Sequence, residues 1–156
     1  MFLPGTETAK FLEGLKDEQI QPAGIDLTVD RIFAIDEAGE IDYSNENRKV
    51  PKGTELKFQD KLHLEQGTYR IVYNEIVAMP ENVIGVGLPR SSLMRMGGTV
   101  VCGLWDPGYK GRSQGLLVVF NPKGITVHKN ARLVQIFLIK GETAGKYSGT
   151  YQGENL

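Results

Sequence analysis

The chain has 156 residues, of which 40% are apolar and 24% are charged, and its formal net charge is −1. This size and balance indicate one soluble globular domain that can bury a real core. No apolar run reaches the roughly 18 residues of a membrane span, the first ten residues lack a signal-peptide pattern, and the single Cys102 excludes an intramolecular disulfide. We therefore expect a cytoplasmic protein with a buried thiol and no membrane contact.

The charges are unevenly distributed along the chain. Residues 1–81 contain 9 Lys/Arg and 16 Asp/Glu, whereas residues 82–156 contain 9 Lys/Arg and only 3 Asp/Glu. The second half either lines an anionic ligand or pairs with the first half, within one chain or across an oligomer. The basic residues are scattered, without an RNP-like stretch or a recognition helix, so no nucleic-acid partner is expected.

The predicted elements are one N-terminal helix and many short strands. The helix is expected within residues 6–20, where Phe11, Leu12 and Leu15 have helical spacing. The polar stretch 37–53 is expected to be a surface loop. Runs rich in β-branched and aromatic residues then predict strands at 25–29, 31–35, 55–58, 67–73, 83–88, 115–120, 125–128 and 132–139. With 19 glycines and 7 prolines, this pattern predicts a single all-β domain over residues 1–156, a sandwich or jelly roll.

The stretch LPRSSLMRMGG, residues 88–98, ends an apolar run and then offers groups that suit an anion. Arg90 and Arg95 carry planar guanidinium forks, and Ser91 and Ser92 add hydroxyl and backbone donors. The segment is a candidate phosphate site. It could equally be a strand end that leads into a helical turn, with serine as a cap and the arginines in solvent.

The stretch WDPGYKG, residues 105–111, carries the only carboxylate between Glu81 and Glu142. Asp-Pro-Gly-Tyr predicts a type II turn, with proline second and glycine third. A carboxylate between Trp105 and Tyr109 could also orient a water, while Tyr109 offers a flat face to a sugar or base.

Two further features are weaker. The tail KYSGTYQGENL, residues 146–156, could be a flap or a disordered terminus. Gln135 is a lone polar residue in an apolar strand and could be satisfied locally.

Four segments in order resemble the motifs of the trimeric dUTPase and dCTP deaminase superfamily, with an archaeal-type dUTPase as the nearest pattern. They are AGIDL (23–27), PRSSL (89–93), GLWDPGYKG (103–111) and ARLVQIF (131–137). The resemblance implies a distorted jelly-roll (β-clip) subunit with one short N-terminal helix, and a homotrimer with three active sites between subunits. It also implies a deoxyuridine triphosphate substrate chelated to Mg²⁺.

The resemblance also assigns roles to residues. Asp106 would hold the water that attacks the α-phosphate and releases dUMP and pyrophosphate, and Tyr109 would pack on the deoxyribose and exclude a 2′-hydroxyl. Asp26 would lie near the metal and act through water. The remaining nucleotide contacts would come from Arg90, Ser91, Ser92, Arg95, Cys102, Gly103, Leu104, Trp105 and Gln135, and from Tyr147, Tyr151 and Gln152 in a C-terminal flap over about residues 141–156.

The choice within the superfamily depends on one position. Deaminases of this type carry a catalytic Glu three residues before an Asn, and counting back from Asn121 gives Val118. Because valine cannot move protons, the sequence favours a dUTP diphosphatase. The alternatives are a dCTP deaminase or bifunctional enzyme, a pyrophosphatase for another deoxynucleotide, and a non-catalytic nucleotide-binding regulator. Arg112, in a segment two residues longer than in either family, could be an added phosphate ligand or only a loop residue.

Overall fold

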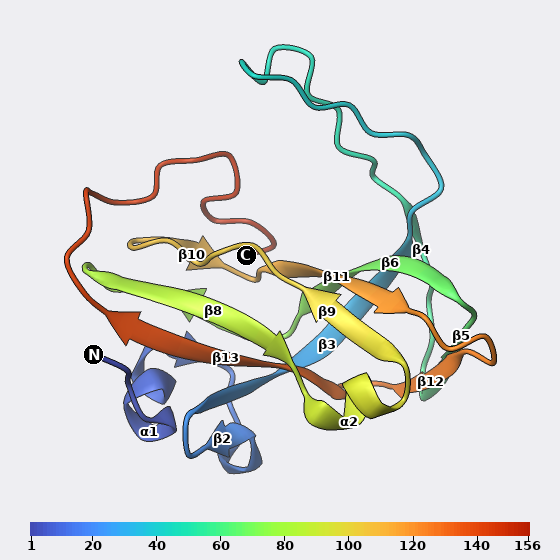
Figure 1. The fold of residues 1–156 in the computed structure, drawn as a ribbon, viewed down its shortest axis with the longest axis horizontal. Coiled ribbons are helices and arrows are strands. Elements are labelled where there is room, and N and C mark those ends of the chain that lie inside the picture. The colour runs from blue at the N-terminus through green and yellow to red at the C-terminus, as the bar shows by residue number, and fades with distance from the viewer.

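The strands of the molecule form one large antiparallel sheet, a three-stranded sheet and a two-stranded sheet (Figure 1). The computed structural model describes residues 1–156. The all-β, jelly-roll-like class predicted from the sequence is confirmed. None of the helices is long and apolar enough to cross a membrane.

The helical elements are short and the strands are many. The helical elements are α1 (Gly5–Thr8), η1 (Ala9–Phe11), η2 (Asp17–Gln19) and α2 (Ser91–Arg95). The strands are β1 (Leu12–Glu13), β2 (Ile20–Gln21), β3 (Gly24–Ala34), β4 (Thr54–Glu55), β5 (Lys61–Leu64), β6 (Gly67–Tyr73), β7 (Ile76–Ala78), β8 (Val83–Pro89), β9 (Gly98–Val101), β10 (Lys110–Gly111), β11 (Gln114–Val119), β12 (Ile125–His128) and β13 (Arg132–Lys140).

The long strand β3 connects the two parts of the large sheet, whose order is β8-β13-β3-β6-β11-β9. Its first half pairs with β13 and its second half pairs with β6, with a register shift between Val29 and Arg31. The sequence predicts two strands here. They are one continuous strand that changes partner at a β-bulge, where the bulge increases the local bend.

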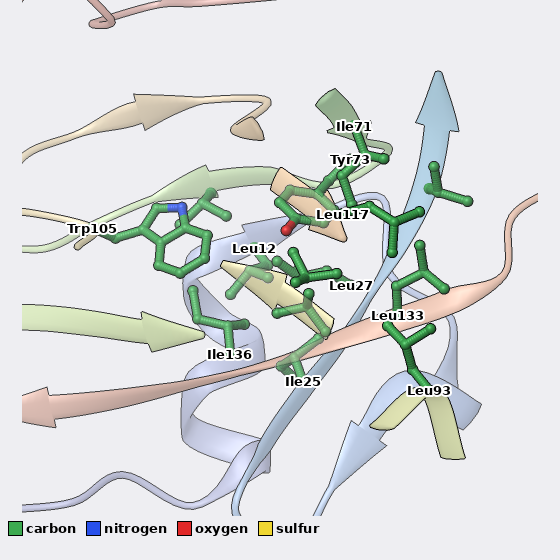
Figure 2. Close-up of a cluster of buried hydrophobic side chains, with 14 of the residues drawn as sticks. Leu12, Ile25, Leu27, Ile71, Tyr73, Leu93, Trp105, Leu117, Leu133 and Ile136 are labelled. Atoms are coloured by element: carbon green, nitrogen blue, oxygen red, sulfur yellow. The ribbon is translucent and has the colours of Figure 1, made fainter. Parts of the chain in front are cut away.

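The core lies between the sheets and is built from alternate residues of the central strands (Figure 2). On β11, Leu117 and Val119 are buried while their neighbours Leu116 and Val118 are only half-buried. This alternation is the period of two that a strand with one face on the core requires.

The N-terminal helix is much shorter than the sequence predicts. Within the predicted range 6–20, the only continuous helical stretch is α1 followed directly by the 3₁₀ turn η1. The chain then extends as β1, where Leu12 pairs with Val77. The helical path ends at Leu12, whose φ of −126° and ψ of 139° are those of an extended strand. Leu12 is still buried, so its apolar spacing reflects contact with the core from a strand instead of a helix.

The loop between β3 and β4, residues 36–53, projects from the body of the molecule (Figure 1). We call this segment the arm. Its two sides are joined where Glu40 and Lys49 exchange backbone hydrogen bonds of 3.0 and 2.9 Å. This agrees with the predicted surface loop.

A core substitution tests this packing. Ile136→Ala removes a side chain that is fully buried on β13, so we expect the free energy of unfolding to fall by about 2–5 kcal/mol. Ile41→Ala, at an 83% exposed position of the arm, is the matched control and should change it by less than about 0.5 kcal/mol. Chemical denaturation measures both, and equal effects would contradict the assignment of the core.

Candidate active site

The Asp-Pro-Gly-Tyr segment forms the type II turn that the sequence predicts. The backbone N–H of Tyr109 donates to the carbonyl of Asp106 at 3.2 Å, and Gly108 has a φ of +79°. The Met79 carbonyl accepts a hydrogen bond from the Gly108 N–H at 3.1 Å, and the Met79 N–H donates to the Tyr109 carbonyl at 2.8 Å. These bonds fix the direction of the turn relative to the body of the protein.

Trp105 fixes the residue before the turn. It exchanges backbone hydrogen bonds with Gly85 of β8, at 2.9 and 3.1 Å, and its indole N–H donates to the Ser113 hydroxyl at 2.9 Å. The indole is 4% exposed and packs in the core (Figure 2). A Cβ at Gly87 would lie 2.9 Å from its ring, so glycine is needed there. Trp105 therefore anchors the turn and presents little of its ring to a ligand.

A cavity of about 300 Å³ opens beside the turn, within the range of small-molecule sites. Asp106 lines it and is half-buried. The cavity is formed by residues from the arm, the central strands, the turn and the C-terminal residues: Val50, Arg70, Gly103, Leu104, Trp105, Asp106, Tyr109, Ser113, Gln114, Tyr147, Tyr151 and Glu154.

The tail, residues 141–156, arches over β10 and is docked against its own chain (Figure 1). The N–H of Tyr147 donates to the Pro107 carbonyl at 2.7 Å, and the N–H of Gly153 donates to the Lys110 carbonyl at 2.7 Å. The Gln152 amide accepts from the Lys110 N–H and donates to the Gly108 carbonyl, each at 2.8 Å. Tyr147, Tyr151 and Gln152, which the sequence analysis selected, thus lie beside the turn.

Arg112 is an anchor for this tail. Its backbone N–H donates to the Glu154 carbonyl at 3.0 Å, and its Nη1 donates to the Asn155 carbonyl at 2.9 Å. Its Nε donates to the Asn74 carbonyl at 3.0 Å, which holds the guanidinium in place. The fork of Arg112 is thus occupied by backbone carbonyls, one of which belongs to the tail.

Glu154 is a cavity residue that the sequence analysis missed. Its Oε1 accepts the Tyr109 hydroxyl at 2.7 Å, and the Tyr109 ring meets Tyr147 edge-on at 5.8 Å. Burial raises the pKa of Glu154, and the Tyr109 hydrogen bond and the charge of Arg70 oppose this. Burial, the hydrogen bond and the Glu154 charge together raise the pKa of Tyr109. One signal in the sequence could have indicated Glu154, since it is one of only 3 acids after residue 81.

Asp26, Arg90 and Arg132 form a second cluster at the end of β8. The Asp26 Oδ2 lies 3.0 Å from Arg90 Nε and 3.4 Å from Arg132 Nη1, and its side chain is 3% exposed. Burial raises the pKa of Asp26, and the charges of the two arginines oppose this. Gln135 pairs across the sheet with Asp26 on one side and Leu88 on the other.

The predicted phosphate segment begins beside this cluster. Helix α2 starts at Ser91, directly after Arg90, and Ser91, Ser92 and Arg95 are all exposed. The N-cap residue is Arg90 and no side chain caps the helix, so the expectation of a serine cap is wrong.

Within one chain the two groups of predicted site residues lie apart. Trp105 pairs with Gly85 near the start of β8, whereas Arg90 follows its end, about 16 Å away at the rise of a strand. None of Asp26, Arg90 or Gln135 lines the cavity. Cys102 does not line it either, because its Sγ lies 3.4 Å from the Tyr73 hydroxyl.

The side chains do not form a metal site of their own. No group of three or more His, Cys, Asp or Glu residues is placed to hold an ion. The carboxylate of Asp26 is already compensated by two arginines. Within one chain the residues present thus form no three-ligand set for a metal, and the pairing of Asp26 with two arginines does not suit direct coordination there.

Comparison with known proteins gives consistent matches. The family model described as dCTP deaminase-like matches residues 6–141. A probable deoxyuridine 5′-triphosphate nucleotidohydrolase of Methanosarcina mazei is 44% identical over 89% of this chain and 84% of its own. The deoxyuridine 5′-triphosphate nucleotidohydrolase of Methanocaldococcus jannaschii is 44% identical over 96% of this chain and 97% of its own.

A solved structure supports the fold. The 2′-deoxycytidine 5′-triphosphate deaminase from Agrobacterium tumefaciens superposes with a TM-score of 0.67 at 20% identity, over 90% of this chain. The match covers 48% of that protein, so this chain spans about half its length. At this identity the likeness concerns the fold alone.

The anchoring role of Arg112 can be tested by proteolysis. Arg112→Ala removes two charge-assisted hydrogen bonds, so we expect the tail to open more often and trypsin to cleave after Lys146 roughly tenfold faster. Lys123→Ala, an exposed position in the turn before β12, is the control. Cleavage rates measured by mass spectrometry that do not differ between the two variants would exclude the anchor.

Proposed function

Since the chain belongs to the dCTP deaminase-like family, we propose that it is a dUTP diphosphatase, which hydrolyses dUTP to dUMP and pyrophosphate. The observation that carries the proposal is the placement of Asp106. It is the only carboxylate for dozens of residues in either direction, and it lies half-buried in the cavity on a turn that hydrogen bonds hold rigid. The names of the relatives, which are nucleotidohydrolases for dUTP, support the same activity.

In the proposed reaction, Asp106 orients a water for in-line attack on the α-phosphate. A carboxylate in this position accepts a proton from the water as the oxygen–phosphorus bond forms, and pyrophosphate leaves. General-base help of this kind contributes about 10²–10⁴-fold, so positioning and electrostatics must supply the rest. The hydrogen bonds that fix Trp105 and Tyr109 on either side of Asp106 provide that positioning.

We propose that the phosphate ligands come from a neighbouring subunit of a homotrimer. Arg90 lies about one β-strand away from the turn in its own chain, too far to contact the phosphate that faces Asp106. The ion pair with Asp26 orients the Arg90 fork, and Ser91, Ser92, Arg95 and Gln135 lie near it. A second copy that brings this group to the cavity would complete the site.

Exposed apolar side chains support such an assembly. Leu88, Val101, Leu104 and Phe120 are between 54% and 62% exposed, on or next to the strands that carry the two groups of site residues. Apolar surface of this kind usually becomes covered by a partner.

The metal in this proposal arrives with the substrate. The triphosphate would carry Mg²⁺, which offsets its negative charge, because the chain offers no ligand set of its own. The arginines of the neighbouring subunit would supply the remaining positive charge.

Deamination of dCTP is the second candidate, because the family model carries that name. It is disfavoured by Val118. This residue lies on the face of β11 that also carries Gln114 of the cavity, where the resemblance predicts the catalytic acid of a deaminase. An aliphatic side chain there cannot move protons.

The tail is proposed to act as a flap over the bound nucleotide. It already contacts the turn through Tyr147 and Gln152, and it contributes three of the side chains that line the cavity. A segment of this kind excludes water and helps to orient the substrate when it closes.

The activity is tested by incubating the protein with Mg²⁺ and either dUTP or dCTP and separating the products by chromatography. We expect dUMP and pyrophosphate from dUTP, and no change in dCTP. Asp106→Asn should bind dUTP but lose at least about 10²-fold in kcat. Unchanged turnover in this variant would contradict the mechanism, and deaminated products from dCTP would contradict the argument from Val118.

A mixing experiment tests the shared site. Asp106→Asn and Arg90→Gln should each be inactive, whereas subunit exchange between them should restore roughly a quarter of the sites if each site takes the two residues from different subunits. Circular dichroism checks that both variants fold. Activity that stays absent after exchange would place both residues in one chain's site.

A further inference from the structure

The hydrogen bond between Tyr109 and Glu154 joins the tail to Tyr109, the residue to which the family resemblance assigns contact with the sugar. Tyr109 is 6% exposed, and its hydroxyl donates to Glu154 Oε1 at 2.7 Å. The other oxygen, Oε2, accepts from the Gln114 amide at 3.4 Å. The carboxylate thus lies between the phenol and a central strand of the large sheet.

We propose that Glu154 is a positioning residue that fixes the Tyr109 ring and thereby sets the preference for 2′-deoxyribose over ribose. This inference rests on the proposed function, because it concerns the sugar of the same nucleotide. An apolar wall that can shift rejects an added hydroxyl only weakly. A ring that cannot move turns the same hydroxyl into a steric clash, so the rigidity of Tyr109 determines the discrimination.

Tyr109 is held at three points, and only one of them is Glu154. The turn and the hydrogen bonds with Met79 fix its backbone. On one side, its ring packs against the Tyr147 ring in a T-shaped arrangement. These contacts fix the Cα and one side of the ring. The position of the far end of the ring, at the hydroxyl, depends on the Glu154 carboxylate.

Glu154 is itself held firmly enough to act in this way. The Arg112 N–H binds its carbonyl, and the neighbouring Asn155 is bound by Arg112 Nη1 and, through its Oδ1, by Arg31 Nη2 at 3.2 Å. Gly111 permits the close approach, because a Cβ there would lie 2.7 Å from the Tyr109 hydroxyl and 3.0 Å from the Glu154 carbonyl. The carboxylate therefore has a fixed origin on the backbone of the tail.

Removal of the carboxylate leaves the Tyr109 hydroxyl without this acceptor in a buried position. A buried donor without a partner is costly, so the ring is expected to tilt toward water in the cavity. This movement opens space beside the sugar. The effect should therefore appear in the choice between nucleotides more than in the rate with dUTP.

The test compares kcat/KM for dUTP and for UTP in three variants. Glu154→Ala should lower the ratio of kcat/KM for dUTP to kcat/KM for UTP about tenfold, because the use of UTP rises relative to the use of dUTP. Glu154→Gln keeps an oxygen that accepts the phenol proton and should restore most of the ratio. Glu142→Ala, an exposed carboxylate of the same tail with no partner in the chain, is the matched control and should leave the ratio unchanged.

A double-mutant comparison separates positioning from a structural role. Tyr109→Phe lacks the hydroxyl and should lower the ratio as Glu154→Ala does, and the double variant should lower it no further. If Glu154→Ala instead reduces activity on dUTP and UTP equally and leaves the ratio unchanged, Glu154 only anchors the tail and the proposal is wrong.

Failure of this inference can be distinguished from failure of the proposed function. If the wild-type protein hydrolyses neither nucleotide, the proposed reaction is wrong, but sugar selection can still be measured by binding. Trp105 is the only tryptophan and lines the cavity, so its emission can be followed while α,β-imido-dUTP or α,β-imido-UTP is added. The ratio of the two dissociation constants should then fall about tenfold in Glu154→Ala, and an unchanged ratio would overturn the inference.

Discussion

The arrangement of the site depends on the backbone pairing between Trp105 and Gly85. This pairing attaches the segment before the turn to β8, and the bonds from Met79 attach the segment after it. Because both ends are fixed, the position of the Asp106 backbone is set by the body of the protein and not by a free loop. The buried indole of Trp105 leaves no room for a side chain at position 87. The packing of the core against β8 therefore also fixes the segment that leads into the turn.

The uneven charge of the sequence has two structural outcomes. Some cations of the second half pair with acids of the first half, as Arg90 and Arg132 do with Asp26. Others bind backbone carbonyls, as Arg112 does with Asn74 and Asn155. The pairing of the two halves is therefore confirmed. An anionic ligand stays a prediction, and Arg90, with 31% of its side chain exposed, is a group that could meet one.

Local sequence was sufficient for features whose determinants are neighbours in the chain. The type II turn follows from proline and glycine at fixed positions and was predicted correctly. Most runs of β-branched residues are strands as predicted, but the run 55–58 is a strand only at Thr54–Glu55, and β5, β7 and β9 were not predicted. The helix over residues 6–20 was predicted too long, because apolar spacing alone cannot distinguish a helix from turns and a short strand that reach the same core. The contacts of Glu154 and the anchoring role of Arg112 were beyond such reasoning, since their partners lie about 40 residues away in the chain.

Within one chain, the turn that carries Asp106 and the cluster of Asp26, Arg90 and Arg132 lie apart, and this separation bears on the proposed hydrolysis of dUTP. One chain supplies a carboxylate on a fixed turn and the cavity beside it, which we propose takes the base and sugar, and the same chain presents its arginine cluster elsewhere. A single copy could thus bind part of a nucleotide, with Arg70 as the one cation that lines the cavity, but its Arg90 group could not reach the phosphates there. In that case association of subunits would be a condition of catalysis, because the anionic substrate would meet the Arg90 group only where two copies adjoin. In this proposal the docked tail would close the part of the cavity that faces the sugar. The neighbouring subunit would then supply the residues that face the phosphates.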